Sequence, residues 1–205
     1  MKLPFIHIKT DSNSKILFIC IAITALLNTM AFPAVTKFLV SSLPARWLAA
    51  EEIVITFSLI VLCRLWNNDK FRDKSIPKFA YIYFTEGLIG AALVFYSAFI
   101  DLNPWVLAIG FLILTSVISV WLSRIIIAFK SILFKDRERE DYDNNHELVY
   151  SIAAFVGSLI AIVMDPPIKL ALIIYGIAML GDVGWIIVYF KNKEKLIMQS
   201  EHNVS

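Results

Sequence analysis

Three charged residues lie inside long apolar stretches of the sequence: Glu86, Arg124 and Asp182. A charged side chain in hydrocarbon costs roughly a few kcal/mol or more, so it normally faces a partner or a water-filled cavity. Arg124 can neutralise either acid or both, and burial favours the protonated form of an acid that has no cation beside it. Such a group can bind and release protons, as a proton-coupled carrier requires. The structural alternative is that Arg124 extends to the cytoplasmic surface and Asp182 marks an early helix end.

The stretches that hold these charges have the composition of membrane-spanning helices. Of the 205 residues, 59% are apolar and 18% are charged, which leaves too few polar residues to cover a water-soluble domain of this size. A helix needs about 20 mainly apolar residues to cross the hydrocarbon, where its backbone amides must be satisfied within the helix. The sequence therefore predicts an all-α, polytopic membrane protein with six transmembrane helices, at about residues 16–40, 47–66, 79–100, 104–129, 147–164 and 168–190.

The distribution of Lys and Arg predicts the orientation of these helices. All but three of the 19 cations fall in the two tails or in and beside the second and fourth connections, and the exceptions are Lys37, Arg46 and Lys169. Because cations gather on the cytoplasmic side, we expect both termini in the cytoplasm. This gives cytoplasmic tails at 1–15 and 191–205, a transmembrane domain at 16–190, and cytoplasmic loops at about 67–78 and 130–146.

The connections differ in character between the two sides. The charged stretch at 134–147 is predicted to form a short solvated helix lying at the cytoplasmic surface. On the other side, short turns at 101–104 and 165–167 each hold a proline that suits the first turn of the following helix. We expect an integral membrane protein of the bacterial plasma membrane.

In this topology the three charges share one level. At about 1.5 Å per residue, each lies roughly 9 to 12 Å below the cytoplasmic end of its helix. We therefore predict a substrate or proton site formed by Glu86, Arg124 and Asp182. Asn28, in the middle of the first helix, is a further candidate, and its alternative role is a hydrogen bond to a neighbouring helix. Small residues accompany the charges, and Gly157 and Ser158 form another such patch, which predicts close approach of helices.

The connection after the second helix reads LWNNDKFRDK, residues 65–74. It resembles the signature loop of the major facilitator superfamily (MFS), in which a glycine, an aspartate and a basic residue precede a second glycine and further basic residues. Asp69, Lys70 and Lys74 match the acidic and basic positions, whereas both glycines are absent from this chain. The passage 134–164 and the topology as a whole also resemble one six-helix half of an MFS transporter.

The resemblance implies a function in transport. MFS transporters have two such halves, which rock about a central site to expose it on alternate sides of the membrane. This chain matches one half, so we expect it to pair as a homodimer or with a second half-transporter chain. The solute is expected to be small and its identity is unknown, and coupling to protons is expected from the charged level.

Two other function classes fit the same features. One is a substrate-binding membrane subunit of a vitamin-uptake type system, and the other is a non-transport immunity or accessory membrane protein. No nucleic-acid partner is expected, because the cations are scattered between apolar runs. We expect neither enzymatic activity nor a cofactor or metal: His7, His146 and His202 lie in tails or a loop, and the cysteines have no metal-binding spacing.

Overall fold

Helices make up all the regular structure that the computed structural model describes, which covers residues 12–66, 85, 87–113, 127, 130, 133–134, 136–179, 183–192 and 194. The predicted all-α class is confirmed for these residues. The helices are α1 (Ser12–Ser42), α2 (Ala45–Trp66), the helix Gly87–Phe99, α4 (Pro104–Leu112), α6 (Asp136–Met164), α7 (Ile168–Met179) and α8 (Val183–Lys191).

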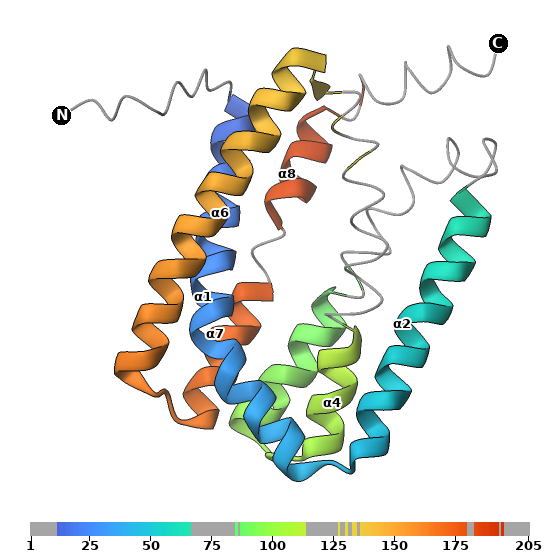
Figure 1. The fold of residues 1–205 in the computed structure, drawn as a ribbon, viewed down its shortest axis with the longest axis vertical. Coiled ribbons are helices and arrows are strands. Elements are labelled where there is room, and N and C mark those ends of the chain that lie inside the picture. The colour runs from blue at the N-terminus through green and yellow to red at the C-terminus, as the bar shows by residue number, and fades with distance from the viewer. Residues whose placement is uncertain are drawn as a thin grey trace.

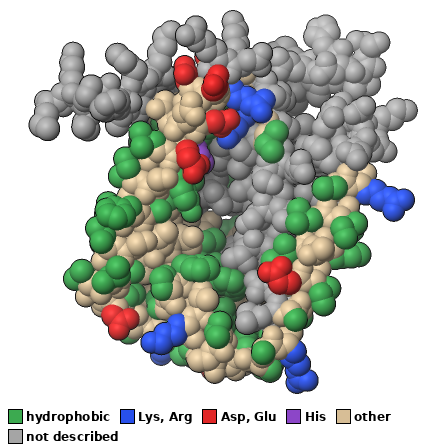
Figure 2. Space-filling model, in the orientation of Figure 1, with side chains coloured by type: hydrophobic (Ala, Val, Ile, Leu, Met, Phe, Trp, Pro, Cys, Tyr) green, Lys and Arg blue, Asp and Glu red, His purple; other side chains and the backbone are tan. Residues whose placement is uncertain are grey.

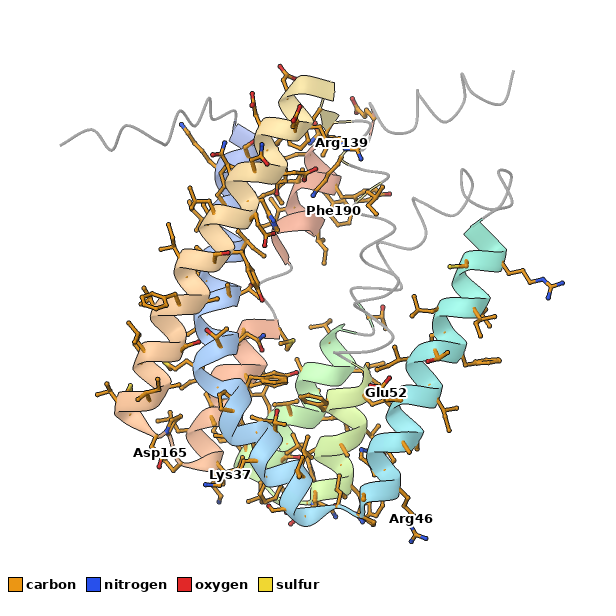
Figure 3. The ribbon with its side chains drawn as sticks, viewed as in Figure 1. Lys37, Arg46, Glu52, Arg139, Asp165 and Phe190 are labelled. Atoms are coloured by element: carbon orange, nitrogen blue, oxygen red, sulfur yellow. The ribbon has the colours of Figure 1, made fainter. Side chains whose placement is uncertain are left out.

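The helices run up and down between two ends of the bundle (Figure 1). α1 and α6 begin at the end where α8 finishes, and α2, α4 and α7 begin at the opposite end, where α1 finishes. Lys37, Arg46 and Asp165 lie at this second end, whereas Arg139 and Phe190 lie at the first (Figure 3). The sequence predicts Lys37, Arg46 and Asp165 outside and Arg139 and Phe190 on the cytoplasmic side. The members of each predicted group lie at the same end of the bundle.

Among the described residues, two helices are long and apolar enough to cross a membrane, Asn13–Ser42 and Glu138–Met164. Only 11% of the apolar stretch of the second is buried inside the protein. Phe155, for example, is 65% exposed in the middle of α6. Figure 2 shows hydrophobic side chains spread over the middle of this face, with most charges toward the ends. An apolar surface of this kind suits a lipid solvent, because soluble monomers rarely expose large apolar patches.

The buried core joins α1 to the helices on its inner side. α1 packs most extensively on α6 and α7, and also touches α8 and α4. Tyr175 is the largest side chain in the core, and its ring stacks on Phe111 with a centroid distance of 5.8 Å. Around it lie fully or nearly fully buried residues of four helices: Ala31, Val35, Leu39, Val94, Ala98, Leu107, Ala108, Ala171 and Leu172.

The two predicted outer turns are present. Asn103 caps α4: its side-chain oxygen accepts hydrogen bonds from the backbone N–H groups of Trp105, at 3.0 Å, and Val106, at 3.4 Å. Pro104 occupies the first turn, where its missing N–H costs nothing. α6 ends before Asp165, whose φ of 37° turns the chain, and the two prolines that follow prevent the helix from continuing.

The structure differs from the expectation in the charged stretch before α6. Residues 136–146 were expected in a cytoplasmic loop with a separate surface helix, but they form the first three turns of α6, which is continuous over 29 residues. Glu and Arg, which fill positions 137–140, are good helix formers, so the helix begins well before the apolar pattern, which starts only after His146. In the last predicted span, α7 and α8 are both helical, and residues 180–182 between them lie outside the described part.

Candidate functional site

The predicted charged level cannot be placed in this structure. Glu86, Arg124 and Asp182 all lie outside the described residues, as do Asp69, Lys70 and Lys74 of the MFS-like loop. The network among them stays a prediction. Asn28 is the one predicted site residue that the structure describes, and it lies within α1.

Asn28 belongs to the face of α1 that points into the bundle. Thr24, Asn28, Ala31 and Val35 are spaced four, three and four residues apart, which places them on one side of an α-helix. Ala31 and Val35 are fully buried in the core. Thr24 and Asn28 lie on the same side of α1 as Ala31 and Val35, nearer to the end of the bundle where α1 begins. We call these two polar residues the α1 polar face.

The polar atoms of this face are buried without satisfying one another. Among the residues that the structure describes, Thr24 Oγ1 and Asn28 Oδ1 have no hydrogen-bond partner, and the same holds for Thr36 Oγ1 further along α1. Leaving one such group unpaired costs about 1–3 kcal/mol. A chain selected for stability alone would place apolar residues here, so the α1 polar face is suited to a partner from outside the protein: water or a small polar solute.

Thr29, which follows Asn28, is placed for a hydrogen bond between helices, which was the alternative role predicted for Asn28. The Thr29 hydroxyl has three carbonyl oxygens within hydrogen-bond distance: Ala25 at 2.8 Å and Leu26 at 3.3 Å in its own helix, and Ala154 of α6 at 3.1 Å. Its single hydrogen can be donated to one of them at a time. This contact does not involve Asn28, whose Oδ1 has no hydrogen-bond partner among the described residues.

Two residues, one on α1 and one on α6, give this region its shape. Pro33 lies inside the helix and has no N–H for the carbonyl of Thr29, and Figure 1 shows α1 bending along its length. On the other side, Gly157 of α6 approaches so closely that a Cβ there would overlap Thr29 Oγ1 and the Leu26 carbonyl oxygen. The prediction of close approach at Gly157 is confirmed, and the partner helix is α1.

A second polar group of residues lies at the end of the bundle where α6 begins, and the sequence did not single it out. Tyr142 is only 3% exposed, although charged residues surround it in the sequence. Its ring stacks on Phe18 of α1, with centroids 5.1 Å apart, and on Phe134, with centroids 4.9 Å apart. Lys130 Nζ lies 5.2 Å from the centre of the Tyr142 ring and forms an ion pair with Asp143.

His146 completes this group. It lies one turn after Tyr142 on α6, with ring centroids 5.8 Å apart. It precedes the apolar part of α6, and burial, with the positive charge of Lys130 as a second cause, lowers the pKa of its imidazole below the ordinary value of 6.5. The nearby acids Glu147 and Asp143 act in the opposite direction and do not cancel this effect. The signal in the sequence was an aromatic residue within a charged stretch.

The comparisons with known proteins add no assignment. No protein-family model matches this chain, and neither a curated protein nor a solved structure matches it. The resemblance to an MFS half therefore stays an expectation that rests on the loop at 65–74, the passage 134–164 and the predicted topology. Within the described ranges, no group of three His, Cys, Asp or Glu side chains is placed to hold a metal ion.

Proposed function

We propose that this chain is a six-span integral membrane protein that works as half of an MFS-like carrier, moving a small polar solute across a bacterial plasma membrane. A homodimer, or a pair with a second half-sized chain, would supply the other half of the substrate path. Protons would couple through Glu86, Arg124 and Asp182. Two features of the described residues support the proposal.

The first is the contrast between the outside and the inside of the bundle. Large apolar side chains are exposed on the outer surfaces of α2 and α6, including Ile53 at 68% and Phe155 at 65%. The unpaired polar atoms of the α1 polar face lie on the inside. A soluble domain shows the opposite distribution, whereas a carrier needs a lipid-facing exterior and a polar interior path.

The second feature, which carries the proposal, is the Asn28 amide. Its oxygen accepts, its nitrogen donates, and it bears no net charge. Together with the Thr24 hydroxyl it suits a neutral solute with both hydrogen-bond donors and acceptors. Charge neutralisation would then be left to the acids and the arginine nearer the cytoplasm, so solute and proton would occupy different levels.

A flux measurement with the purified chain tests this function. Liposomes that contain the protein and the pH-sensitive dye pyranine are offered pools of amino acids, sugars and nucleosides. We expect at least one pool to cause proton entry, and the variants Glu86→Gln and Asp182→Asn to remove or shift its pH dependence while inserting normally. The oligomeric state in nanodiscs is measured on the same preparation. A strict monomer that moves no protons with any pool would contradict the proposal and favour an accessory role.

A further inference from the structure

The buried group around Tyr142 joins three segments that are separate in the sequence. Tyr142, Asp143 and His146 come from α6, Phe18 comes from α1, and Lys130 comes from the connection before α6. The backbone N–H of Phe134 donates to the Lys130 carbonyl at 3.0 Å, so these two residues belong to one turn. The side chains of Lys130 and Phe134 both contact Tyr142, which makes Tyr142 the point where these two residues are held against α6.

We propose that this group, which we call the Tyr142 latch, is a pH-sensitive contact that holds Lys130 and Phe134 against Tyr142 of α6 at neutral pH and releases them on acidification. Lys130 is 15% exposed and is held by two interactions, with the Asp143 carboxylate and with the face of the Tyr142 ring. His146 is four residues after Tyr142 and three after Asp143, so it lies beside both of these residues on the same side of α6.

Protonation of His146 changes the balance of charge in the latch. Among the described residues, the charged groups that act on its ring are Lys130, Glu147 and Asp143. An imidazolium would repel Lys130 and compete with it for Asp143, which is 43% exposed and cannot satisfy both cations without rearrangement. Lys130 would then leave the Tyr142 ring for solvent, and the turn that carries Phe134 would loosen with it.

The sign of the pH dependence follows from linkage. The pKa of His146 is lowered in the closed latch and returns toward 6.5 when the latch opens. The closed form is therefore fully favoured above about pH 6.5 and weakens as the pH falls toward the lowered pKa, below which the effect is constant. In that window the ratio of open to closed latch rises by at most about tenfold per pH unit.

Hydrogen exchange of the full chain in nanodiscs measures this opening. Exchange at residues 136–146 is compared at pH 7.5 and pH 5.5, after correction for the intrinsic pH dependence of amide exchange. We expect protection to fall at pH 5.5 in the wild type and to stay unchanged in His146→Gln, which cannot titrate. The matched control is His7→Gln combined with His202→Gln, which keeps one titrating histidine and should behave like the wild type.

Two further variants keep the test decisive. Lys130→Gln removes the cation that opposes protonation of His146, so its pH response should be smaller than that of the wild type. Tyr142→Leu removes the aromatic contacts, so protection should be low at both pH values. Equal protection of the wild type at the two pH values, or an unchanged response in His146→Gln, would overturn the proposal. Neither result depends on whether the protein transports a solute.

Discussion

Replacing Gly157 with alanine is expected to destabilise the bundle by about 1–3 kcal/mol, the usual cost of forcing extra volume into a packed interface. The added Cβ would overlap Thr29 Oγ1 and the Leu26 carbonyl oxygen of α1. The backbone oxygen cannot rotate away, so α1 and α6 would have to separate. We expect a lower midpoint in an SDS unfolding titration and a lower Tm in mild detergent.

Gly87 provides the matched control for this substitution. It is also a helical glycine, but a Cβ at this position would meet nothing within 4 Å. Gly87→Ala should leave stability unchanged or raise it by up to about 1 kcal/mol, because alanine loses less backbone entropy in a helix. In a Thr29→Ala background Gly157→Ala should cost less but still destabilise, since the Leu26 carbonyl remains. Equal effects of Gly157→Ala and Gly87→Ala would show that the helices do not cross where the structure places them.

Replacing Asn28 with leucine is expected to reduce solute flux by at least about tenfold, the loss that follows when one good hydrogen bond to a solute is removed. The same substitution should preserve stability or raise it by about 1–3 kcal/mol, because it removes a buried amide oxygen that has no hydrogen-bond partner among the described residues. Opposite effects on activity and stability are what distinguish a binding residue from a packing residue. Flux in liposomes and the SDS unfolding midpoint give the two values.

Ser97 is the control for Asn28. It is fully buried, as a polar residue within the core, but its hydroxyl donates to the Leu93 carbonyl at 3.1 Å, so its hydrogen bond is already made. Ser97→Ala should therefore leave flux near the wild-type value. If Asn28→Leu lowers stability and flux together, the amide supports packing and the proposed solute contact is wrong.

The helices that contain long apolar runs could be predicted from the sequence. The runs at 16–40 and 147–164 lie within α1 and α6, and the turns at 101–104 and 165–167 end or begin helices as their prolines require. Hydropathy reports only where a helix is apolar, however. The charged stretch at 134–147 was predicted to be a separate surface helix, and hydropathy could not show that its helix continues without a break into the apolar part of α6.

The candidate site was less predictable, because pairing between helices depends on their packing. The small side chain of Gly157 indicated close approach, but nothing in the sequence identified Thr29 as its partner, since many rotations of α1 against α6 fit the same apolar pattern. Likewise Asn28 and Thr29 are both polar and adjacent. Only the structure shows that Thr29 faces Ala154, while Asn28 lies on the side of α1 that carries the buried residues Ala31 and Val35.

The central claim is that lipid covers the exposed apolar residues while the interior near Asn28 is wet, and cysteine labelling tests both halves together. Single cysteines are placed at Asn28 and at Phe155, both in the middle of long helices, in a chain whose Cys20 and Cys63 are serine. Maleimide reacts with the thiolate, which forms in water and not in hydrocarbon. In native membranes we predict labelling at position 28 and none at position 155, although Phe155 is 65% exposed. Rapid labelling at 155 with none at 28 would contradict the account.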